Sequence, residues 1–192
     1  MFKHLITVTT LCTLVACSQS AAPPPAAVSG ITPQVYTDSL YAVMSSDRAN
    51  YTQLIISRLG PDGIGVIKPN EYWEEHENGA PLPAQMFRFG SEKVAEKTSA
   101  FTYQLKSLWP INAQNGPRTP MEEAGLTYIA EHPGENFYGE EELGGVTYYT
   151  AVYPDTAVAN SCINCHNGHI DSPRTDFVMG EVMGGVVIRV PL

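Results

Sequence analysis

Apolar side chains recur at helical spacing in the stretch of chain that follows residue 30. They return every three or four positions, and the set is Tyr36, Leu40, Val43, Met44, Tyr51, Leu54, Ile55 and Leu59. Thr32 before Pro33 is typical of a helix N-cap followed by proline in the first turn. Gly60-Pro61 then ends the apolar run, as glycine and proline do after many helices. The pattern therefore predicts one long amphipathic helix over residues 33–59.

Two further helices are predicted in the middle of the chain. The first covers residues 83–98 and begins with a proline. The residues expected on its inward face are Met86, Phe89 or Gly90, and Val94. The sequence Thr119-Pro120-Met121-Glu122 has the form of a capping box. It predicts another helix, which ends before Pro133.

The last third of the chain changes to the alternation that is typical of strands. Residues 146–153 and 186–190 are rich in β-branched and aromatic side chains, and each run follows a pair of glycines. With a further candidate at 101–108, they predict an antiparallel sheet. The paired glycines have two interpretations: close approach of a bulky ligand, or ordinary hairpin and bulge positions. A short helical turn is expected over residues 154–158. The order of elements predicts an α+β fold, with the helices first and the sheet mostly at the end.

Residues 1–16 have the composition of a secretory signal peptide. A short basic start precedes an apolar run over residues 5–16, which is too short to span a bilayer. The run ends in Leu14-Val15-Ala16-Cys17, which resembles the lipobox of bacterial lipoproteins. That resemblance implies cleavage before Cys17 and lipidation of this cysteine. The alternative is an ordinary signal cleaved a few residues later.

Residues 17–31 follow as a tether of small side chains and proline, which cannot bury apolar surface. We therefore expect one domain over residues 32–192, on the periplasmic side of a bacterial membrane and held there only by the lipid anchor. The formal net charge is −9 and the isoelectric point is near 4.9. Because nucleic acid and anionic lipid both attract basic surfaces, neither is an expected partner. The expected partner is a redox or signalling protein.

Two of the four cysteines lie together in the sequence SCINCHNGH, residues 161–169. Cys12 would leave with the signal peptide and Cys17 would carry lipid, so Cys162 and Cys165 are the thiols of the folded part. A structural zinc site normally uses four ligands, often as two such pairs, and no second pair is present in the sequence. The reactive cysteine of a thioredoxin-like dithiol begins a helix early in a βαβ unit. Here the cysteine pair lies late in the chain, after an expected helical turn. A disulfide across three positions would restrain little of the chain and leave the adjacent histidine unexplained.

The pattern Cys-X-X-Cys-His has one interpretation that uses all three residues. In c-type haem attachment, two thiols form thioethers with the haem vinyl groups and the histidine becomes an iron ligand. This attachment takes place outside the cytoplasm, where the signal peptide would send the chain. We therefore predict one covalent haem c, bound by Cys162 and Cys165, with His166 as the iron ligand.

The segments around this motif carry a family resemblance. ANSCINCHNGHIDSPRTDF and VMGGVVIRVPL, together with the loop SLWPINAQNGPRT and the helix around PAQMFR, resemble the c-type haem domain family with a PAS-like fold. The resemblance covers residues 32–192 and is most specific over 144–192. Members occur as lone exported proteins and as extracytoplasmic sensor domains of histidine kinases and chemoreceptors. The resemblance implies a PAS-like antiparallel sheet flanked by N-terminal helices, with haem held against the sheet.

The resemblance also bears on the other ligands of the haem. In part of the family a cysteine is the distal iron ligand, and this chain has no cysteine left for that role. Methionine is a natural substitute, and Met86 is predicted as the ligand because rough alignment places it at that position; the other interpretation is a core role. For the haem propionates, Arg174 is predicted as the partner. The other candidates are Arg88, Arg118, Arg189, Asn112 and Asn115.

These features predict a lipid-anchored monohaem c-type cytochrome that acts in electron transfer or in haem-based redox or gas sensing. The alternative is a small haem peroxidase. That enzyme would need an acid–base side chain beside an open iron, supplied by His76, His132 or His169. A non-enzymatic role is the favoured expectation.

Overall fold

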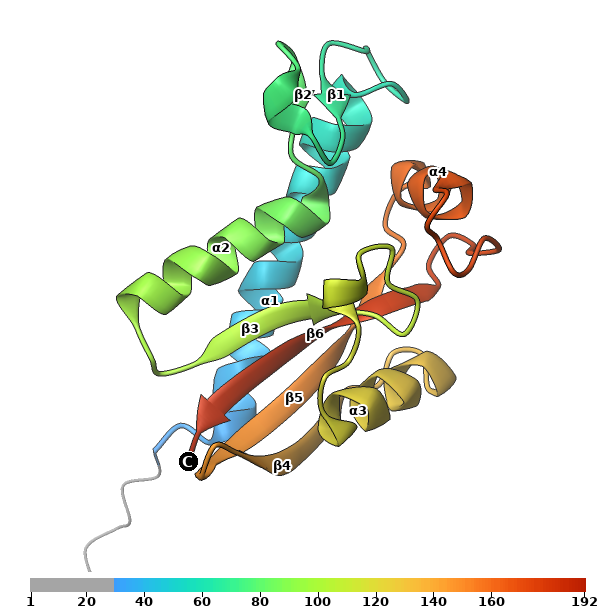
Figure 1. Ribbon diagram of the computed structural model, residues 1–192. Helices are drawn as coiled ribbons and strands as arrows, with labels where there is room; N and C mark the ends of the chain where they lie inside the picture. The colour runs from blue at the N-terminus through green and yellow to red at the C-terminus, as the bar shows by residue number, and fades with distance from the viewer. Residues whose placement is uncertain (1–29) are drawn as a thin grey trace, which may run out of the picture. The chain divides into compact units, whose positions relative to one another are not determined.

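A four-stranded antiparallel sheet lies at the centre of residues 30–192, the part of the chain that the computed structural model describes (Figure 1). The strand order is β3–β6–β5–β4, and two very short strands, β1 and β2, pair separately in parallel. In chain order the elements are α1 (Pro33–Asn50), the π-helix η1 (Tyr51–Ser57), β1 (Lys68–Pro69), the 3₁₀-helix η2 (Trp73–Glu75), β2 (Gly79–Ala80), α2 (Pro83–Lys97), β3 (Thr102–Lys106), the 3₁₀-helix η3 (Ala113–Asn115), α3 (Pro120–Glu131), β4 (Phe137–Leu143), β5 (Val146–Thr156), α4 (Asn160–Gly168) and β6 (Val182–Pro191). The α+β class predicted from the sequence is confirmed.

The two central strands supply both halves of the core, because successive residues of a strand face opposite sides of the sheet. One cluster combines Ala151, Tyr153, Val186 and Ile188 with Phe87 of α2 and with partly buried side chains of α1. The other combines Val152 and Val187 with Leu126 and Ile129 of α3. Helices α1 and α2 therefore pack on one face of the sheet, and α3 packs on the other (Figure 1).

The long first helix is confirmed in its extent, but its predicted inward face is partly wrong. Thr32 caps it, since its hydroxyl accepts a hydrogen bond from the backbone N–H of Val35 at 3.2 Å. Leu54 is exposed, whereas Thr52 is fully buried. The helix changes to π geometry at Tyr51, and a wider turn shifts every later side chain around the axis. Thr52 tolerates burial because its hydroxyl donates to the carbonyl of Arg48 at 2.8 Å.

Strand β4 was not predicted, although it pairs with β5 along its full length. Its consecutive glutamates have low strand propensity, but β4 is an edge strand of the sheet, where charged side chains are common. Glu140 and Glu142 are exposed, and Glu141 pairs with Arg189. The turn to β5 consists of Gly144 and Gly145, with φ angles of 61° and 82°. Positive φ at both positions is typical of a two-residue hairpin. The hairpin interpretation of this glycine pair is confirmed.

The second glycine pair, in β6, allows close packing. A Cβ at Gly184 would lie 2.5 Å from the carbonyl oxygen of Lys106 in the neighbouring strand, and one at Gly185 would lie 2.8 Å from a methyl group of Ile129 in α3. Glycine at position 184 therefore lets β3 lie close to β6, and glycine at position 185 lets α3 pack closely on the sheet.

The helical turn expected over residues 154–158 is wrong. Strand β5 continues to Thr156, pairing with β6 through a register irregularity between Asp155 and Thr156. Cross-strand pairing overrides the local turn signal of Pro154-Asp155 here. The helix begins at Asn160 instead, so the Cys-X-X-Cys-His motif lies within α4.

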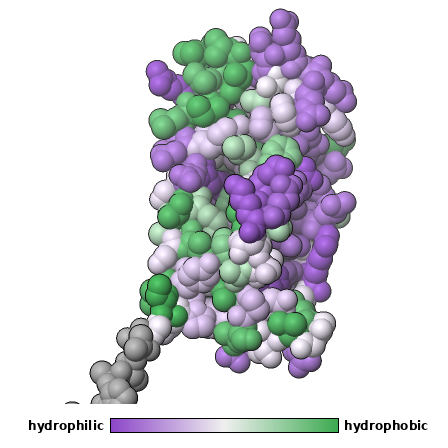
Figure 2. Space-filling model, turned by 90° about the vertical axis from the view of Figure 1, so that its left-hand side faces the viewer, coloured by the Kyte–Doolittle hydropathy of each residue, from purple (hydrophilic) through white to green (hydrophobic). Residues whose placement is uncertain are grey.

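On the face drawn in Figure 2 most of the surface is polar, and the largest group of hydrophobic residues lies at one end. There, hydrophobic side chains gather at the end of the molecule that carries η1 and the loop after it (Figure 2). Leu54, Ile64 and Val66 of these segments are 55%, 67% and 52% exposed. Between residues 30 and 192, no helix has the length and apolar character that crossing a membrane requires.

Candidate functional site

A cleft of about 760 Å³ opens at one end of the sheet. Its walls come from α1 and η1, the loop that carries β1 and β2, α2, the loop between β3 and α3, and α4. Its volume falls within the range of about 300–1,000 Å³ that is usual for ligand and cofactor pockets. Of the elements that form its walls, α4 and the loop of β1 and β2 stand above the sheet in the upper part of Figure 1.

Helix α4 brings the Cys-X-X-Cys-His residues to the cleft. Cys165 and His166 follow Cys162 by three and four positions, so the three residues share one side of the helix. All three line the cleft. Both cysteines are free thiols. The helix is fixed at both ends. The hydroxyl of Ser161 is 2.8 Å from that of Ser57 in η1, and the Asn167 amide exchanges two hydrogen bonds with the backbone of Phe177 at 2.9 and 3.0 Å.

His166 has the electrostatic character of a neutral ligand. Burial lowers the pKa of its ring, and the nearby charges of Arg48 and His169 lower it further. The neutral imidazole is the form that binds metal ions. Its Nδ1 atom is buried and has no hydrogen-bond partner among residues 30–192. The ring meets Phe177 edge to face, with 5.9 Å between centroids. The histidine is thus held in a defined orientation with hydrogen-bonding capacity unused.

The surroundings of Cys165 do not favour a reactive thiol. Burial raises the pKa of this thiol, and the negative charges of Glu71 and Cys162 raise it further. A dithiol redox pair needs the opposite, a thiolate stabilised by its surroundings. Nor does the described part of the chain contain a group of three His, Cys, Asp or Glu side chains that would hold a metal ion. Neither the zinc nor the dithiol interpretation gains support.

Basic side chains line the cleft on the side of α2 and the loop between β3 and α3. Lys106 donates to the carbonyl oxygens of Gln114 and Gly116 at 3.3 and 3.1 Å, and burial lowers the pKa of its amine. The candidates for propionate contacts that line the cleft are Arg88, Arg118, Asn112 and Asn115. Guanidinium and amide groups at these positions suit carboxylates at the cleft edge.

Arg174 does not line the cleft, so its prediction as the propionate partner is not supported. Its guanidinium lies over the rings of Trp109 and Phe177, at 4.8 and 4.4 Å from their centroids. It also forms ion pairs with Asp176 and Glu181. Arg189 is remote as well, buried with Glu122 on the face that α3 covers. Closeness in sequence to the attachment motif did not bring Arg174 into the cleft.

Met86 is also absent from the residues that line the cleft, and it is 47% exposed. Helix α2 covers Pro83–Lys97, close to the predicted range, and Gly90 and Val94 of the expected inward face pack against the core as predicted, but Phe87 rather than Met86 is buried. Phe87 is buried and lines the cleft, and Gly90 lies so close to Tyr103 that a Cβ would be 2.6 Å from the phenol oxygen. Both interpretations of Met86, as iron ligand and as core residue, therefore conflict with its position in the structure.

One of the three histidines considered for acid–base chemistry reaches the cleft. His169 lines it, but its Nε2 lies 3.6 Å from a Glu71 carboxylate oxygen and its Nδ1 accepts from the Asp171 N–H at 3.1 Å. Neither His76 nor His132 lines the cleft. The ring of His132 stacks on that of Tyr128, with 4.2 Å between centroids. The peroxidase alternative thus gains no free acid–base histidine from these three.

Sequence reasoning missed an ion pair inside the cleft. Nη2 of Arg48 in α1 lies 2.8 Å from Oδ2 of Asp155 in β5, and both side chains are largely buried. The residues are 107 positions apart, so no local pattern could connect them. An arginine near the apolar face of a helix was the only sequence signal.

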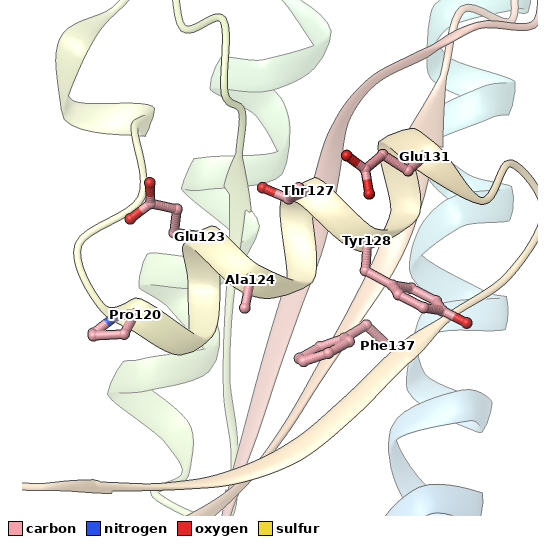
Figure 3. Close-up of a pocket in the computed structure, with 7 residues that line it drawn as sticks. All are labelled: Pro120, Glu123, Ala124, Thr127, Tyr128, Glu131 and Phe137. Carbon is pink, nitrogen blue, oxygen red and sulfur yellow. The ribbon is translucent and has the colours of Figure 1, made fainter.

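A second, shallower depression of about 430 Å³ lies along α3, with Phe137 of β4 on its other side (Figure 3). Its lining residues are Pro120, Glu123, Ala124, Thr127, Tyr128, Glu131 and Phe137. In Figure 3, Tyr128 and Phe137 lie together beside the helix, and their ring centroids are 5.7 Å apart. It contains none of the predicted site residues. The cleft beside α4 is therefore the candidate site.

The site thus defines the protein as an α+β domain that presents a Cys-X-X-Cys-His helix to a cofactor-sized cleft. The model of the Tll0287-like family matches residues 31–191, and the chain belongs to this family. Among solved structures, that of the cyanobacterial heme-protein Tll0287 is similar, with a TM-score of 0.53 and 14% sequence identity. The match covers 83% of this chain and 96% of that one, and it shows a shared fold. Curated proteins give no significant match.

Proposed function

We propose that this protein is a c-type monohaem protein with a PAS-like fold, in which Cys162 and Cys165 bind haem covalently and His166 ligates the iron. The observation that carries the proposal is the position of these three residues on one side of α4, lining a cleft of about 760 Å³. The buried, unpartnered Nδ1 of His166 and the two free thiols fit such a group. Membership of the Tll0287-like family supports haem as the cofactor.

The residues of the chain have separate roles in this proposal. Ser57 and Asn167 hold α4 in place through the hydrogen bonds described above. Arg88 and Arg118 offer cationic groups to the haem carboxylates. When bound, the haem supplies one-electron exchange and an iron that can bind small ligands. The protein then acts in electron transfer or in haem-based sensing, with a redox or signalling protein as its partner.

We further propose that the protein is exported and anchored by lipid at Cys17. This residue and the tether over 17–31 lie almost entirely outside the residues that the structure describes. The proposal rests on the basic start, the short apolar run and the lipobox-like sequence. It agrees with haem attachment through thioethers, which takes place outside the cytoplasm.

Covalent attachment is tested by denaturing the protein expressed with a c-type haem maturation system. Haem should stay with the wild-type chain on a denaturing gel and in acidified organic solvent, whereas Cys162→Ala with Cys165→Ala should release it. His166→Ala should keep the covalent bond but change the absorption spectrum, because only the iron ligand is lost. Extraction of haem from denatured wild-type protein would contradict the proposal.

A further inference from the structure

Arg48 brings a buried and incompletely bonded cation into the cleft. One terminal nitrogen is paired with Asp155 at 2.8 Å, and the side chains of the two residues are 14% and 17% exposed. The Nε atom of Arg48 is buried and has no hydrogen-bond partner within residues 30–192. A buried N–H without an acceptor destabilises a protein. We therefore expect a bound molecule to supply the acceptor.

The residues around Arg48 limit the size and polarity of a ligand that could supply this acceptor. Thr52 and Ile56 follow it at intervals of four residues and line the same cleft. The Thr52 hydroxyl already donates to the Arg48 carbonyl, and Ile56 is apolar and buried. The wall formed by α1 and η1 therefore offers one strong donor, which lies beside the Asp155 carboxylate, together with the apolar side chain of Ile56. A small ligand with a single acceptor atom suits such a wall better than a large polar group.

The same wall offers no side chain that ligates haem iron. Among the described residues of α1, η1 and α2, none of those that line the cleft is a histidine, cysteine, methionine or tyrosine. Elsewhere the cleft contains three such side chains besides the attachment motif: Tyr72, His169 and Met183. Tyr72 is 66% exposed, His169 is engaged with Glu71, and Met183 is buried against Ala157 and Phe177.

We propose that the sixth coordination position of the iron is left open for a small exogenous ligand, and that Arg48, held by Asp155, donates a hydrogen bond to that ligand. The inference rests on the proposed haem attachment at His166, which lines the same cleft as Arg48. The ligand class is a diatomic gas or a small anion. Polarity and donors on the distal side decide how haem treats such ligands.

The test uses the full-length holoprotein, with fluoride as the probe of the ferric form and carbon monoxide as the probe of the ferrous form. The wild type should bind both. Arg48→Leu should weaken fluoride binding by about tenfold to a hundredfold, the range expected for a lost hydrogen bond to a charged acceptor. It should also raise the infrared stretching frequency of bound carbon monoxide, because a positive donor beside the oxygen weakens the C–O bond.

Arg58→Leu is the matched control. It removes the same charge from the residue that follows η1, but Arg58 is exposed and does not line the cleft. We expect fluoride affinity and the carbon monoxide frequency to remain those of the wild type. Because Arg48→Leu leaves the Asp155 carboxylate without its cation, Arg48→Leu with Asp155→Asn is made as well. This pair removes both charges and should show the same loss of fluoride affinity.

Three results would overturn the inference. The first is a wild type with covalent haem that binds neither fluoride nor carbon monoxide; Tyr72→Phe, His169→Ala and Met183→Leu would then identify the side chain on the iron. The second is unchanged fluoride affinity and carbon monoxide frequency in Arg48→Leu. The third is a change in redox potential alone, which would assign Arg48 to a propionate. Wild-type protein without covalent haem would instead contradict the proposed function.

Discussion

Nη2 of Arg189 lies 2.7 Å from Oε1 of Glu122, and this buried ion pair joins the last strand to helix α3. Nε of the same guanidinium lies 2.7 Å from a carboxylate oxygen of Glu141 in the edge strand β4. The three residues link β6, α3 and β4 where their side chains are at most 9% exposed. Desolvation acts to raise the pKa of Glu141, but hydrogen bonds from Arg189 and Thr150 outweigh it and hold that pKa below its usual value.

Arg189→Met should lower the free energy of unfolding by about 3–5 kcal/mol at neutral pH, because two buried carboxylates lose their cation. The pKa of Glu141 is depressed in the folded protein, so its stabilisation is present above the ordinary glutamate pKa and is lost as pH falls through the folded value. The deficit of the variant should therefore shrink toward acid pH. Urea unfolding at neutral pH and at about pH 4 measures this.

The control for this prediction is Arg88→Met. Arg88 faces Glu92 at 3.7 Å on the surface of α2, and both side chains are more than half exposed. An exposed pair of this kind contributes about 0–1 kcal/mol. A deficit of Arg189→Met that stays equal at both pH values would show that lost packing, not lost charge pairing, destabilises the variant.

Gly185→Ala should destabilise the protein through overpacking. The new Cβ would lie 2.8 Å from Cδ1 of Ile129 and 2.9 Å from Cδ2 of Leu126, so these buried side chains, or α3 itself, would have to shift. A loss of about 1–3 kcal/mol is expected, and urea unfolding measures it. Gly168→Ala is the control, because a Cβ there meets no atom within 4 Å. Equal stability of Gly185→Ala and wild type would show that α3 adjusts freely.

Local patterns were sufficient to predict the elements whose signals lie within a few residues. The N-caps Thr32 and Thr119, the β-branched runs of β5 and β6 and the Cys-X-X-Cys-His spacing are of this kind. The incorrect predictions have causes that these local patterns do not contain. The π-helix at residues 51–57 rotates one end of the first helix, and β4 is a strand only because β5 pairs with it.

The candidate site divides in the same way between local and long-range features. The attachment motif is local, and the structure brings its three residues to one cleft. The predicted partners Met86 and Arg174 lie outside that cleft, since the phase of α2 and the aromatic contacts of Arg174 decide their positions. The Arg48–Asp155 pair joins residues of different elements. Pairs of this kind appear only when the chain is folded.

Met86→Ala should leave the haem spectrum and carbon monoxide binding unchanged. Met86 is 47% exposed on α2 and does not line the cleft in which haem would bind. Absorption spectra of the oxidised and reduced proteins measure this, with His166→Ala as the variant that should change them. Loss of a weak long-wavelength band in oxidised Met86→Ala would instead identify Met86 as the distal ligand.

Cys17→Ser should convert a membrane-associated protein into a soluble exported one. The lipobox-like sequence ends at this cysteine, and stable attachment would depend on the lipid that it carries. Fractionation of a bacterial host, followed by mass determination of the mature N-terminus, measures both effects. Cys12→Ser is the control, because that residue would leave with the signal peptide. A free mature N-terminus downstream of Cys17 in the wild-type protein would contradict lipidation.

Arg174→Leu should loosen the segment between α4 and β6 without changing the haem. The guanidinium lies against Trp109 and Phe177, and it pairs with Asp176 and Glu181. Loss of these contacts should make local opening roughly fivefold to thirtyfold more frequent, since each of the two cation–π contacts contributes about 0.5–1 kcal/mol at exposed sites. Limited proteolysis of the holoprotein within residues 169–181 measures the opening, because cleavage follows the open population.

Arg174→Lys separates stacking from charge in the same experiment. Lysine keeps the positive charge near Asp176 and Glu181 but lacks the planar group that stacks on two rings. Faster cleavage in Arg174→Lys would therefore assign the effect to stacking, and wild-type cleavage would assign it to charge. A shift in the redox potential of Arg174→Leu, with normal proteolysis, would return Arg174 to the role of propionate partner. We expect the potential to stay unchanged because Trp109, not Arg174, lines the cleft at this point.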